Sequence, residues 1–521
     1  MSQPASTPPI PSPASPPAAA PTAPTLTGAA YRRLAAALVG GLGADCVLTG
    51  ADELLSYGYD GGFMEGRPDL VVLPRSAEGV ATAARLATVA GAPVVARGSG
   101  TGLCGGSIPT RGGVVIATTR MNRIVQIDAR NQRATVEPGV INVALSQAAE
   151  PYGLFYAPDP ASQKISTIGG NVATNAGGPH CLALGVTTNH VLAIQVALAT
   201  GELLWLGGGA EGLHDTPGYD LLGAVVGSEG TLAIVTQIVV RLMRQPEAVR
   251  TLLAIYPDVA SGSASVSAII GAGIIPSALE MLDHAICQAI ERHFHAGYPE
   301  DAGSVLLIEL DGAREAVAAQ GERVAALCRA NGAREVRVAR SAAERAALWA
   351  GRKGAAGALG QLAPSYYLQD AVVPRSRLPK IMERIGEISH EYGLTIPNVF
   401  HAGDGNLHPA MLFDRRRNGD IERVIAAGND LLRACVDLGG TVSGEHGIGV
   451  EKRDALTYVF TPYDLAAMAR LRCVFDPREL FNPDKIFPPG TSCLEARPPA
   501  NATSAIQATA LANEESAPWF C

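Results

Sequence analysis

The 521-residue sequence predicts an α+β protein with two folded domains between loose tails. Segments with strand and helix periodicity alternate from about residue 68, and glycine-rich loops follow several strands of the first half. After Pro246 the pattern changes to longer strands alternating with amphipathic helices. We therefore expect tails at 1–28 and 491–521, a first domain at 29–245 and a second at 246–490.

Composition narrows the function classes. Hydrophobic residues make up 47% and charged residues 17%, which is enough apolar material for more than one core. The net charge is −8 and no Lys/Arg block stands out, which argues against nucleic acid as a partner. No segment is typical of a transmembrane helix, and the Pro/Ala/Ser/Thr-rich start lacks the features of a secretory signal.

The nine cysteines argue against a thiolate metal site. They are widely spaced and no pair reads C-x-x-C, so a self-contained Fe–S cluster or zinc–thiolate site is excluded by spacing. This usage suggests a reducing compartment, and most of the cysteines are expected to be small buried hydrophobes. We therefore expect a cytoplasmic protein.

The elements of the first domain can be placed in order. A helix is expected at 31–39, a buried strand at 69–74, an amphipathic helix at 77–90 and a second strand at 93–96. Strand, helix, strand and glycine loop together form an α/β unit with a phosphate-binding loop. Further strands are expected at 113–117, 124–127 and 133–136, and a hairpin at 191–198 and 203–206.

The second domain repeats a looser α+β pattern. Strands are expected at 251–255 and 305–310, helices at 264–270 and 315–330, and a later strand and helix at 366–373 and 378–392. No strict internal repeat is present.

Three glycine-rich sets lie within about 140 residues of the first domain. The first reads Arg97-Gly-Ser-Gly-Thr-Gly102, then Gly105-Gly106-Ser107. Backbone N–H groups in such a loop can cradle a pyrophosphate. The spacing is neither a Rossmann fingerprint nor a Walker A loop, and the first set alone could be a tight turn. The second set runs through 158–162 and 167–178, the third through 227–236; three such sets together are hard to explain as turns.

From about residue 67 to 244 these loops resemble the FAD-binding domain of the vanillyl-alcohol oxidase / p-cresol methylhydroxylase (PCMH) superfamily. The resemblance implies a two-part FAD-binding domain, an α+β substrate (cap) domain, and a C-terminal segment that returns to the FAD-binding domain. The residues implied to hold the pyrophosphate are Arg97, Gly98, Ser99, Gly100, Thr101, Gly102, Gly105, Gly106 and Ser107. Those implied to line the flavin and ribityl chain are Pro158, Asp159, Ser162, Thr167, Gly169, Gly170 and Asn171, with Asn175 and Gly177 nearby and Glu229, Gly230 and Ile234 at the adenine side or the sheet beneath it. Thr101 stands where some members tether the flavin through a His, so the FAD is expected to be non-covalent.

A second constellation lies in the other domain. His401 and His408 flank an Asp-Gly-Asn turn, and Glu445 and His446 lie in a second glycine loop, in a chain with only 10 histidines. A lone His is more often a satisfied core or loop residue. Glu445 alone could cap a turn, and Arg352 alone could be a solvated helix charge. Grouped among glycines, however, two His and a carboxylate suit a divalent Zn²⁺, Mn²⁺ or Fe²⁺ ion.

The motifs at 400–409, 442–449 and 475–485 resemble the D-lactate / D-2-hydroxyglutarate dehydrogenase group, and within it the FAD-linked D subunits of glycolate oxidase. The resemblance covers about 31–488. It implies that His401, His408 and Glu445 bind the metal, that His446 is the base, and that Arg352 grips a substrate carboxylate.

The implied reaction is FAD-dependent oxidation of a small 2-hydroxy acid, such as glycolate to glyoxylate or D-lactate. Metal-assisted proton abstraction would accompany hydride transfer to the flavin. Gly354, Ala355, Ala356 and Ala410 are small where a dicarboxylic substrate would need polar groups, although Lys353 keeps one positive charge nearby. The chain has no Fe–S pattern, so the resemblance implies a second flavin subunit and an Fe–S subunit as partners at the inner face of the membrane.

Three alternatives remain open at this stage. A stand-alone D-lactate or D-2-hydroxyglutarate dehydrogenase would turn over with an artificial acceptor and no partner. A metal hydrolase with structural glycine loops would be colourless. A non-catalytic flavin-binding scaffold subunit would tolerate loss of His446.

Overall fold

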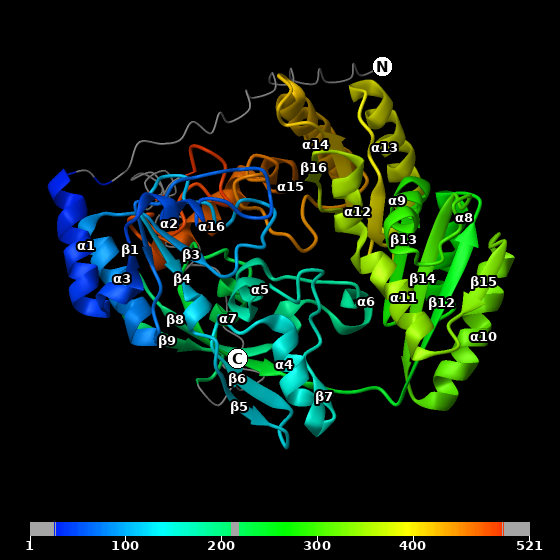
Figure 1. Cartoon of the computed structure of the whole chain (residues 1–521), viewed down its shortest axis with the longest axis horizontal. Helices are drawn as coiled ribbons and strands as arrows, with labels where there is room; N and C mark the ends of the chain where they lie inside the picture. The colour runs from blue at the N-terminus through cyan, green and yellow to red at the C-terminus, as the bar shows by residue number, and fades with distance from the viewer. Residues whose placement is uncertain (1–25, 27, 210–217, 492, 494–521) are drawn as a thin grey trace, which may run out of the picture.

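The computed structural model describes residue 26, residues 28–209 and 218–491, and residue 493. Figure 1 shows the two domains side by side, with the first at the left and the second at the right. The expected tails at 1–28 and 491–521 lie almost wholly outside the described residues, although helix α1 (Gly28–Leu42) begins at the last residue of the first. Within the described chain no helix combines the length and apolar character needed to span a membrane.

The first part of domain one is built on a four-stranded sheet in the order β1-β2-β4-β3. Its strands are β1 (Val47–Leu48), β2 (Leu70–Val72), β3 (Val94–Arg97) and β4 (Val114–Ala117); β1 is antiparallel and the other three are parallel. Helices α1 and α3 (Ala77–Ala90) cover one face, and α2 (Ala51–Leu55) lies against the other. Ser76 caps α3 by accepting a hydrogen bond from Gly79 N–H, and left-handed Gly91 ends it.

The second part is a five-stranded antiparallel sheet in the order β5-β6-β10-β8-β9. Its strands are β5 (Ile124–Asp128), β6 (Arg133–Val136), β8 (Val191–Ala197), β9 (Leu203–Leu206) and β10 (Ile234–Arg241). The short strands β7 (Leu154–Phe155) and β11 (Met243–Arg244) pair beside it. Apolar side chains of α3, β8 and β10 share one core, so α3 is packed between the two sheets. The other face holds α4 (Asn142–Ala149), α5 (Ile168–Thr174) and α7 (Leu221–Val225), while α6 (Cys181–Leu184) extends toward the second domain.

The second domain is a single eight-stranded antiparallel sheet in the order β15-β12-β14-β13-β18-β19-β16, with β17 also paired to β19. Its strands are β12 (Ala248–Tyr256), β13 (Ala278–Asp283), β14 (Ser304–Gly312), β15 (Glu335–Val338), β16 (Ser365–Leu368), β17 (Ala371–Val372), β18 (Asn398–His401) and β19 (Asn406–Phe413). Its two faces each carry a helical layer. One is covered by α8 (Val259–Gly271), α10 (Arg314–Ala330), α13 (Leu378–Tyr392) and α14 (Asp420–Asp437); the other by α9 (His284–Phe294), α11 (Ala342–Lys353) and α12 (Ala355–Leu362).

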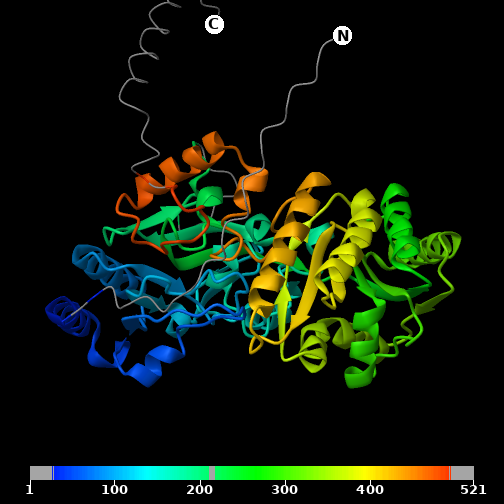
Figure 2. The same ribbon diagram turned by 90° about the horizontal axis from the view of Figure 1, so that it is seen from above.

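The C-terminal segment returns to the first domain, as the fold class requires. After α15 (Leu456–Val459) and α16 (Pro462–Phe475) the chain lies beside β3, where Phe481 bridges to Val94 and is fully buried in the core of the first sheet. Figure 2 shows this segment above the first domain. The buried Lys485 ammonium donates to the Ile108 carbonyl at 2.8 Å.

Two local differences from the sequence-based expectation have physical causes. The expected strand 366–373 is two strands, β16 and β17, because the chain turns at Gln369-Asp370 to bury the Asp370 carboxylate. Cys473 and Cys493 form a disulfide, which their wide spacing did not suggest. Of the six free cysteines among the described residues, five are buried, as expected, and Cys181 is half-buried.

Candidate functional site

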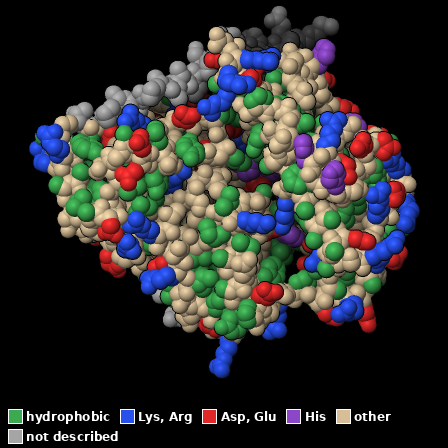
Figure 3. Space-filling model, viewed as in Figure 1, with side chains coloured by type: hydrophobic (Ala, Val, Ile, Leu, Met, Phe, Trp, Pro, Cys, Tyr) green, Lys and Arg blue, Asp and Glu red, His purple; other side chains and the backbone are tan. Residues whose placement is uncertain are grey.

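A cavity of about 420 Å³ lies between the domains. The glycine loops of the first domain line one side, and side chains of α11, β18, β19 and the loop after α14 line the other. The space-filling view shows the hollow at the junction of the two halves, with basic and histidine side chains around it (Figure 3). The two constellations found in the sequence therefore face one cavity.

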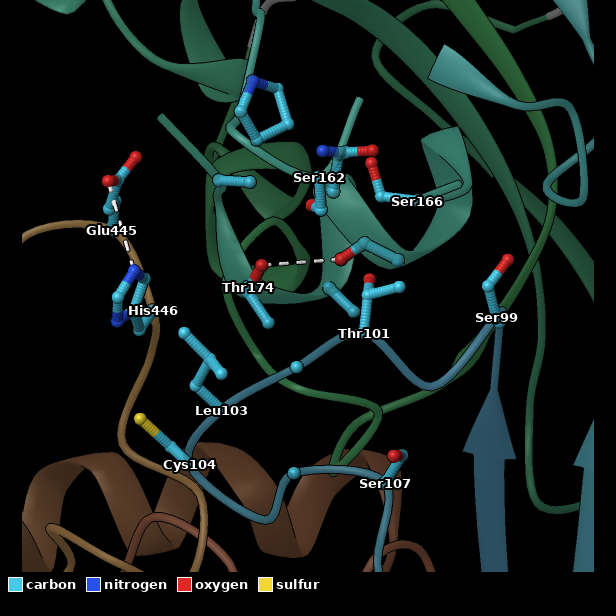
Figure 4. Close-up of a pocket in the computed structure, with 18 of the residues that line it drawn as sticks. Ser99, Thr101, Leu103, Cys104, Ser107, Ser162, Ser166, Thr174, Glu445 and His446 are labelled. Carbon is cyan, nitrogen blue, oxygen red and sulfur yellow. Dashed lines mark hydrogen bonds and ion pairs between the residues drawn. The ribbon is translucent and has the colours of Figure 1, made fainter. Parts of the chain in front are cut away.

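Backbone geometry makes the first-domain side a close-fitting cradle. Figure 4 shows Ser99, Thr101 and Ser107 on the loop that follows β3, facing Ser162 and Thr174 across the cavity. A Cβ on Gly98 would overlap Thr167 Oγ1, and Gly100 has φ +72°. These positions need glycine, which allows a ligand to approach the backbone.

Most of the residues expected to bind the cofactor line this cavity. They are Arg97, Gly98, Ser99, Gly100, Thr101, Gly102, Gly106, Ser107, Ser162, Thr167, Gly169, Gly170, Asn171, Glu229, Gly230 and Ile234. The residues expected there that fall outside the lining are Gly105, Pro158, Asp159, Asn175 and Gly177.

Local contacts explain several of these departures. The Asp159 carboxylate turns toward His180 Nδ1 at 2.9 Å. Asn175 is the left-handed C-cap of α5, and its Oδ1 accepts from Thr188 N–H. The Pro158 carbonyl accepts from Asn142 Nδ2. Gly177 lies against Glu445 of the second domain instead, because a Cβ at position 177 would stand 2.8 Å from Glu445 Oε2.

Glu229 lines the cavity but has a second task. Its two carboxylate oxygens accept from the N–H groups of Ile448 and Gly449 at 2.7 and 2.8 Å. Burial raises its pKa, an effect those two hydrogen bonds oppose. Glu229 thus fastens the third glycine loop to the loop that carries Glu445 and His446.

Sheet register brings His401 and His408 together. His401 ends β18 and pairs with Glu280 on β13, while His408 on β19 pairs with Val399 on β18. Because alternate residues share a face, Glu280, His401 and His408 all lie on the face covered by α11. The expected strand–turn–strand at 401–408 is thus present.

Glu445 completes a compact, buried donor set. Its Oε1 lies 3.1 Å from both His401 Nε2 and His408 Nε2, and the donor atoms of the three residues all lie within 4.8 Å of one another. Burial works to raise the Glu445 pKa, but hydrogen bonds from the two imidazoles hold it well below its usual range. Two imidazoles and an ionised carboxylate are a donor set for a divalent first-row ion.

Arg352 reaches the same site through an ion pair. Glu280 is fully buried; one oxygen accepts from Arg352 Nε and Nη2 at 2.7 and 2.6 Å, and the other lies 2.6 Å from His401 Nδ1. Burial acts to lower the pKa of His401, but Glu280 and Glu445 hold it well above the usual value. Arg352 therefore presents only its remaining N–H groups to the cavity.

His446 is a half-buried imidazole beside His408. Its ring stacks on His408 with centroids 4.9 Å apart, and no described residue hydrogen-bonds its Nδ1. Burial lowers the pKa of His446 to about 4, despite the opposing charge of Asp370. The imidazole is therefore neutral near pH 7 and can accept a proton.

Asp370 holds the loop in place. Its buried carboxylate accepts from the backbone N–H groups of Gly444, Glu445 and His446 and from the side chains of Ser443, Asn406 and Lys452. Burial opposes ionisation, but Lys452, His446 and His408 hold the Asp370 pKa well below its usual range. Neither Glu280 nor Asp370 is among the site residues predicted from the sequence. The signal for Glu280 was an acid in the middle of an otherwise apolar stretch, Ala278-Leu-Glu-Met-Leu282.

Comparisons with known proteins agree with this geometry. The family model "FAD binding domain" matches residues 68–207, and "FAD linked oxidases, C-terminal domain" matches 245–486. The chain is 44% identical to the glycolate oxidase subunit GlcD of Escherichia coli K12, over 85% of this chain and 89% of that protein.

The chain belongs to the FAD-linked oxidase family.

Other relatives of this FAD-linked oxidase agree. It is 42% identical to the glycolate oxidase subunit GlcD of Bacillus subtilis, over 83% of this chain and 92% of that protein. It is 33% identical to a D-lactate dehydrogenase of Anaerostipes hadrus, over 84% and 91%. The fold matches p-cresol methylhydroxylase with a TM-score of 0.75, at 17% identity over 88% of this chain and 97% of that one. The chain is therefore an FAD-dependent oxidoreductase of PCMH-type fold, and the metal-hydrolase alternative is wrong.

The described residues fit both groups that the family and the donor set imply. The cradle around Gly98 and Gly100 has room for a phosphate chain only because side chains are absent there. His401, His408 and Glu445 present converging donors without a hydrophobic side chain between them. Thr101 lines the same cavity.

Proposed function

We propose that this FAD-linked oxidase oxidises a small 2-hydroxy acid, with glycolate to glyoxylate as the leading reaction. The observation that carries the proposal is the convergence of His401, His408, Glu445, His446 and Arg352 on the cavity that the glycine loops line. A candidate base, a set of candidate metal ligands and a candidate carboxylate-binding side chain thus face the proposed flavin pocket. The 42–44% identity to two glycolate oxidase subunits supports the choice of substrate.

His446 is the proposed base. Its neutral, half-buried imidazole would take the proton of the substrate hydroxyl as the α-carbon gives up hydride. Asp370 holds the backbone of this loop, so the imidazole needs little reorganisation before reaction.

Arg352 is the proposed carboxylate-binding residue. Its Nε–Nη2 edge is occupied by Glu280, which leaves the other N–H groups to bind the substrate carboxylate. Glu280 also contacts His401, so the Glu280 carboxylate orients both Arg352 and the proposed metal ligand His401.

The two bound groups would supply the remaining chemistry. FAD, held without a covalent bond, supplies the acceptor for the hydride. A divalent ion held by His401, His408 and Glu445 would supply Lewis acidity toward the substrate oxygens.

Small side chains at the second-domain wall favour a small substrate. Ala355 and Ala356 line the cavity beside Arg352, and neither has a polar group for the distal carboxylate of a dicarboxylic substrate; Lys353 is a further cation in this part of the lining. We therefore propose a short monocarboxylic substrate over 2-hydroxyglutarate.

The relatives' names also suggest an assembly. Two of them are described as glycolate oxidase subunits, and this chain has no Fe–S cysteine pattern. We propose that it passes electrons to a second flavin subunit and an Fe–S subunit, in the cytoplasm at the inner face of the membrane.

The test is the anaerobic visible spectrum of purified, metal-supplied protein before and after glycolate, then D-lactate. Preferential bleaching of the flavin band by glycolate is the expected result. Preferential bleaching by D-lactate would favour the second candidate, a stand-alone D-lactate dehydrogenase, which the Anaerostipes hadrus relative supports. A flavin that no 2-hydroxy acid bleaches would contradict the proposal and favour a scaffold role.

A further inference from the structure

His180 lies outside the cavity, at the junction of the two domains. Its Nδ1 is 2.9 Å from Asp159 Oδ2 in the first domain, and its Nε2 is 3.5 Å from Glu309 Oε1 on β14 of the second. Its ring stacks on Trp349 of α11, with centroids 5.7 Å apart and planes 27° apart. One imidazole thus contacts a carboxylate from each domain and an aromatic ring.

The charges around His180 favour its protonated form. Burial acts to lower its pKa, but Asp159 and Glu309 raise it to about 10. Asp311, further along β14, also interacts with its charge. Near neutral pH the ring is therefore an imidazolium that can donate from both nitrogens.

Trp349 connects this contact to the active-site side of α11. Its Nε1 donates to Glu309 Oε2 at 2.6 Å, and one turn later Arg352 donates to Glu280. Glu309 and Glu280 stand on neighbouring strands, β14 and β13, and on the same face of the sheet. Two buried carboxylates therefore hold α11 on the sheet, and His180 contacts the first of them from the other domain.

We propose that His180 is a positioning residue that ties the FAD-binding domain to Trp349 and so sets where Arg352 stands in the cavity. This inference rests on the proposed role of Arg352. His180 itself does not line the cavity, so it acts through α11 and not on the substrate.

The first test compares His180→Ala with His390→Ala, a matched change at an exposed histidine on α13. The KM for glycolate is expected to rise about tenfold in His180→Ala, because a small misplacement of a positioning group is costly. The kcat and FAD content should stay within about twofold of the parent, and His390→Ala should change nothing. A milder variant, Asp159→Asn, should shift KM in the same direction while keeping the ring in place. An unchanged KM in both His180→Ala and Asp159→Asn would overturn the proposal.

A double-variant cycle tests the route through Arg352. The Kd of glyoxylate, measured by perturbation of the flavin spectrum, is expected to rise on His180→Ala in the parent but to change less than about twofold in an Arg352→Ala background. Equal effects in both backgrounds would show that His180 acts independently of Arg352 and would overturn the proposal.

The fluorescence emission of Trp349 tests the contact with His180 without catalytic turnover. The chain has three tryptophans, and an imidazolium stacked on an indole quenches its emission. Emission should rise in His180→Ala but not in His390→Ala, and His180→Ala should have no effect in a Trp349→Phe background. If no 2-hydroxy acid reduces the flavin, the proposed function fails on that result, while the emission change would still support the interdomain contact. Unchanged emission would overturn it.

Discussion

Burial sets the chemistry of the individual residues at this site. Burial lowers the pKa of His446 to about 4, whereas Glu280 and Glu445 hold the pKa of His401 well above its usual value. Two histidines in one cavity thus have pKa values that are shifted in opposite directions. A neutral His446 suits a base. A divalent ion at His401 would have to replace the proton on Nε2, because an imidazolium cannot ligate a metal, and Glu280 would then accept from Nδ1–H.

Replacing His446 tests the base directly. His446→Ala is expected to slow anaerobic flavin reduction by glycolate about 10²–10⁴-fold, the usual contribution of a general base. FAD content should not change, because the glycine cradle is intact. Stopped-flow absorbance of the flavin band measures the rate; a reduction rate equal to the parent's would contradict the role.

The pH dependence of the same step follows from the His446 pKa of about 4. A base works only when deprotonated, so the rate should be constant from neutral pH down to about 5 and fall as pH drops through about 4. Single-turnover reduction across this range measures it. An acid limb near 6.5, the unperturbed value, would mean that burial does not act on this imidazole.

Replacing Glu280 should lower the stability of the protein. Glu280→Gln leaves the buried Arg352 and His401 without their common counter-charge, and breaking a buried pair typically costs about 3–5 kcal/mol. Thermal unfolding should show a large loss of stability in the second domain. Glu322→Gln, which removes an exposed partner of Arg250, is the control and should have almost no effect. A Glu280→Gln protein as stable as the parent would contradict the ion-pair argument.

At the scale of elements, the loop 443–449 is shaped by what lies around it. Asp370 gathers three of its N–H groups, and Glu229 gathers two more from the first domain. These hydrogen bonds hold the loop in place and keep Glu445 against the imidazoles of His401 and His408.

A glycine substitution tests this packing. In Gly444→Ala the new Cβ would overlap Asn406 Nδ2 and stand 3.0 Å from Asp370 Oδ1, so the loop must shift. Metal content, measured by mass spectrometry after dialysis, is expected to fall severalfold together with activity. Gly386→Ala on α13 is the matched control; it has open space and should add about 0.5–1 kcal/mol of stability. Retention of full metal content in Gly444→Ala would contradict the packing argument.

At the scale of the molecule, the C-terminal segment closes the first domain over the glycine loops. Asn482 Nδ2 donates to the carbonyls of Gly106 and Glu229 at 2.7 and 2.6 Å, and Phe481 fills the core beneath. Three segments that are more than 100 residues apart in the chain thus meet at one side chain. The return of the chain fastens the first glycine loop to the third.

Asn482→Ala is expected to weaken FAD retention about tenfold, because two buried carbonyls lose their donor and each unsatisfied group costs about 1–3 kcal/mol. Metal content should be less affected, since Asn482 does not contact the second domain's donor set. FAD retained after gel filtration measures the effect. Asn131→Ala, in an exposed turn, serves as the control. Equal retention in both variants would contradict the closure argument.

The sequence by itself determined the α+β class, the glycine-rich loops and the presence of His401, His408 and Glu445 as a set. Local chemistry carries that information, because glycine spacing and clustered donors are visible without a fold. Only the tertiary structure decided that these sets face one cavity, that Glu280 joins Arg352 to His401, and that Asp159 turns away to His180. Those contacts depend on sheet register and on pairs more than 20 residues apart in the chain, which no local pattern encodes.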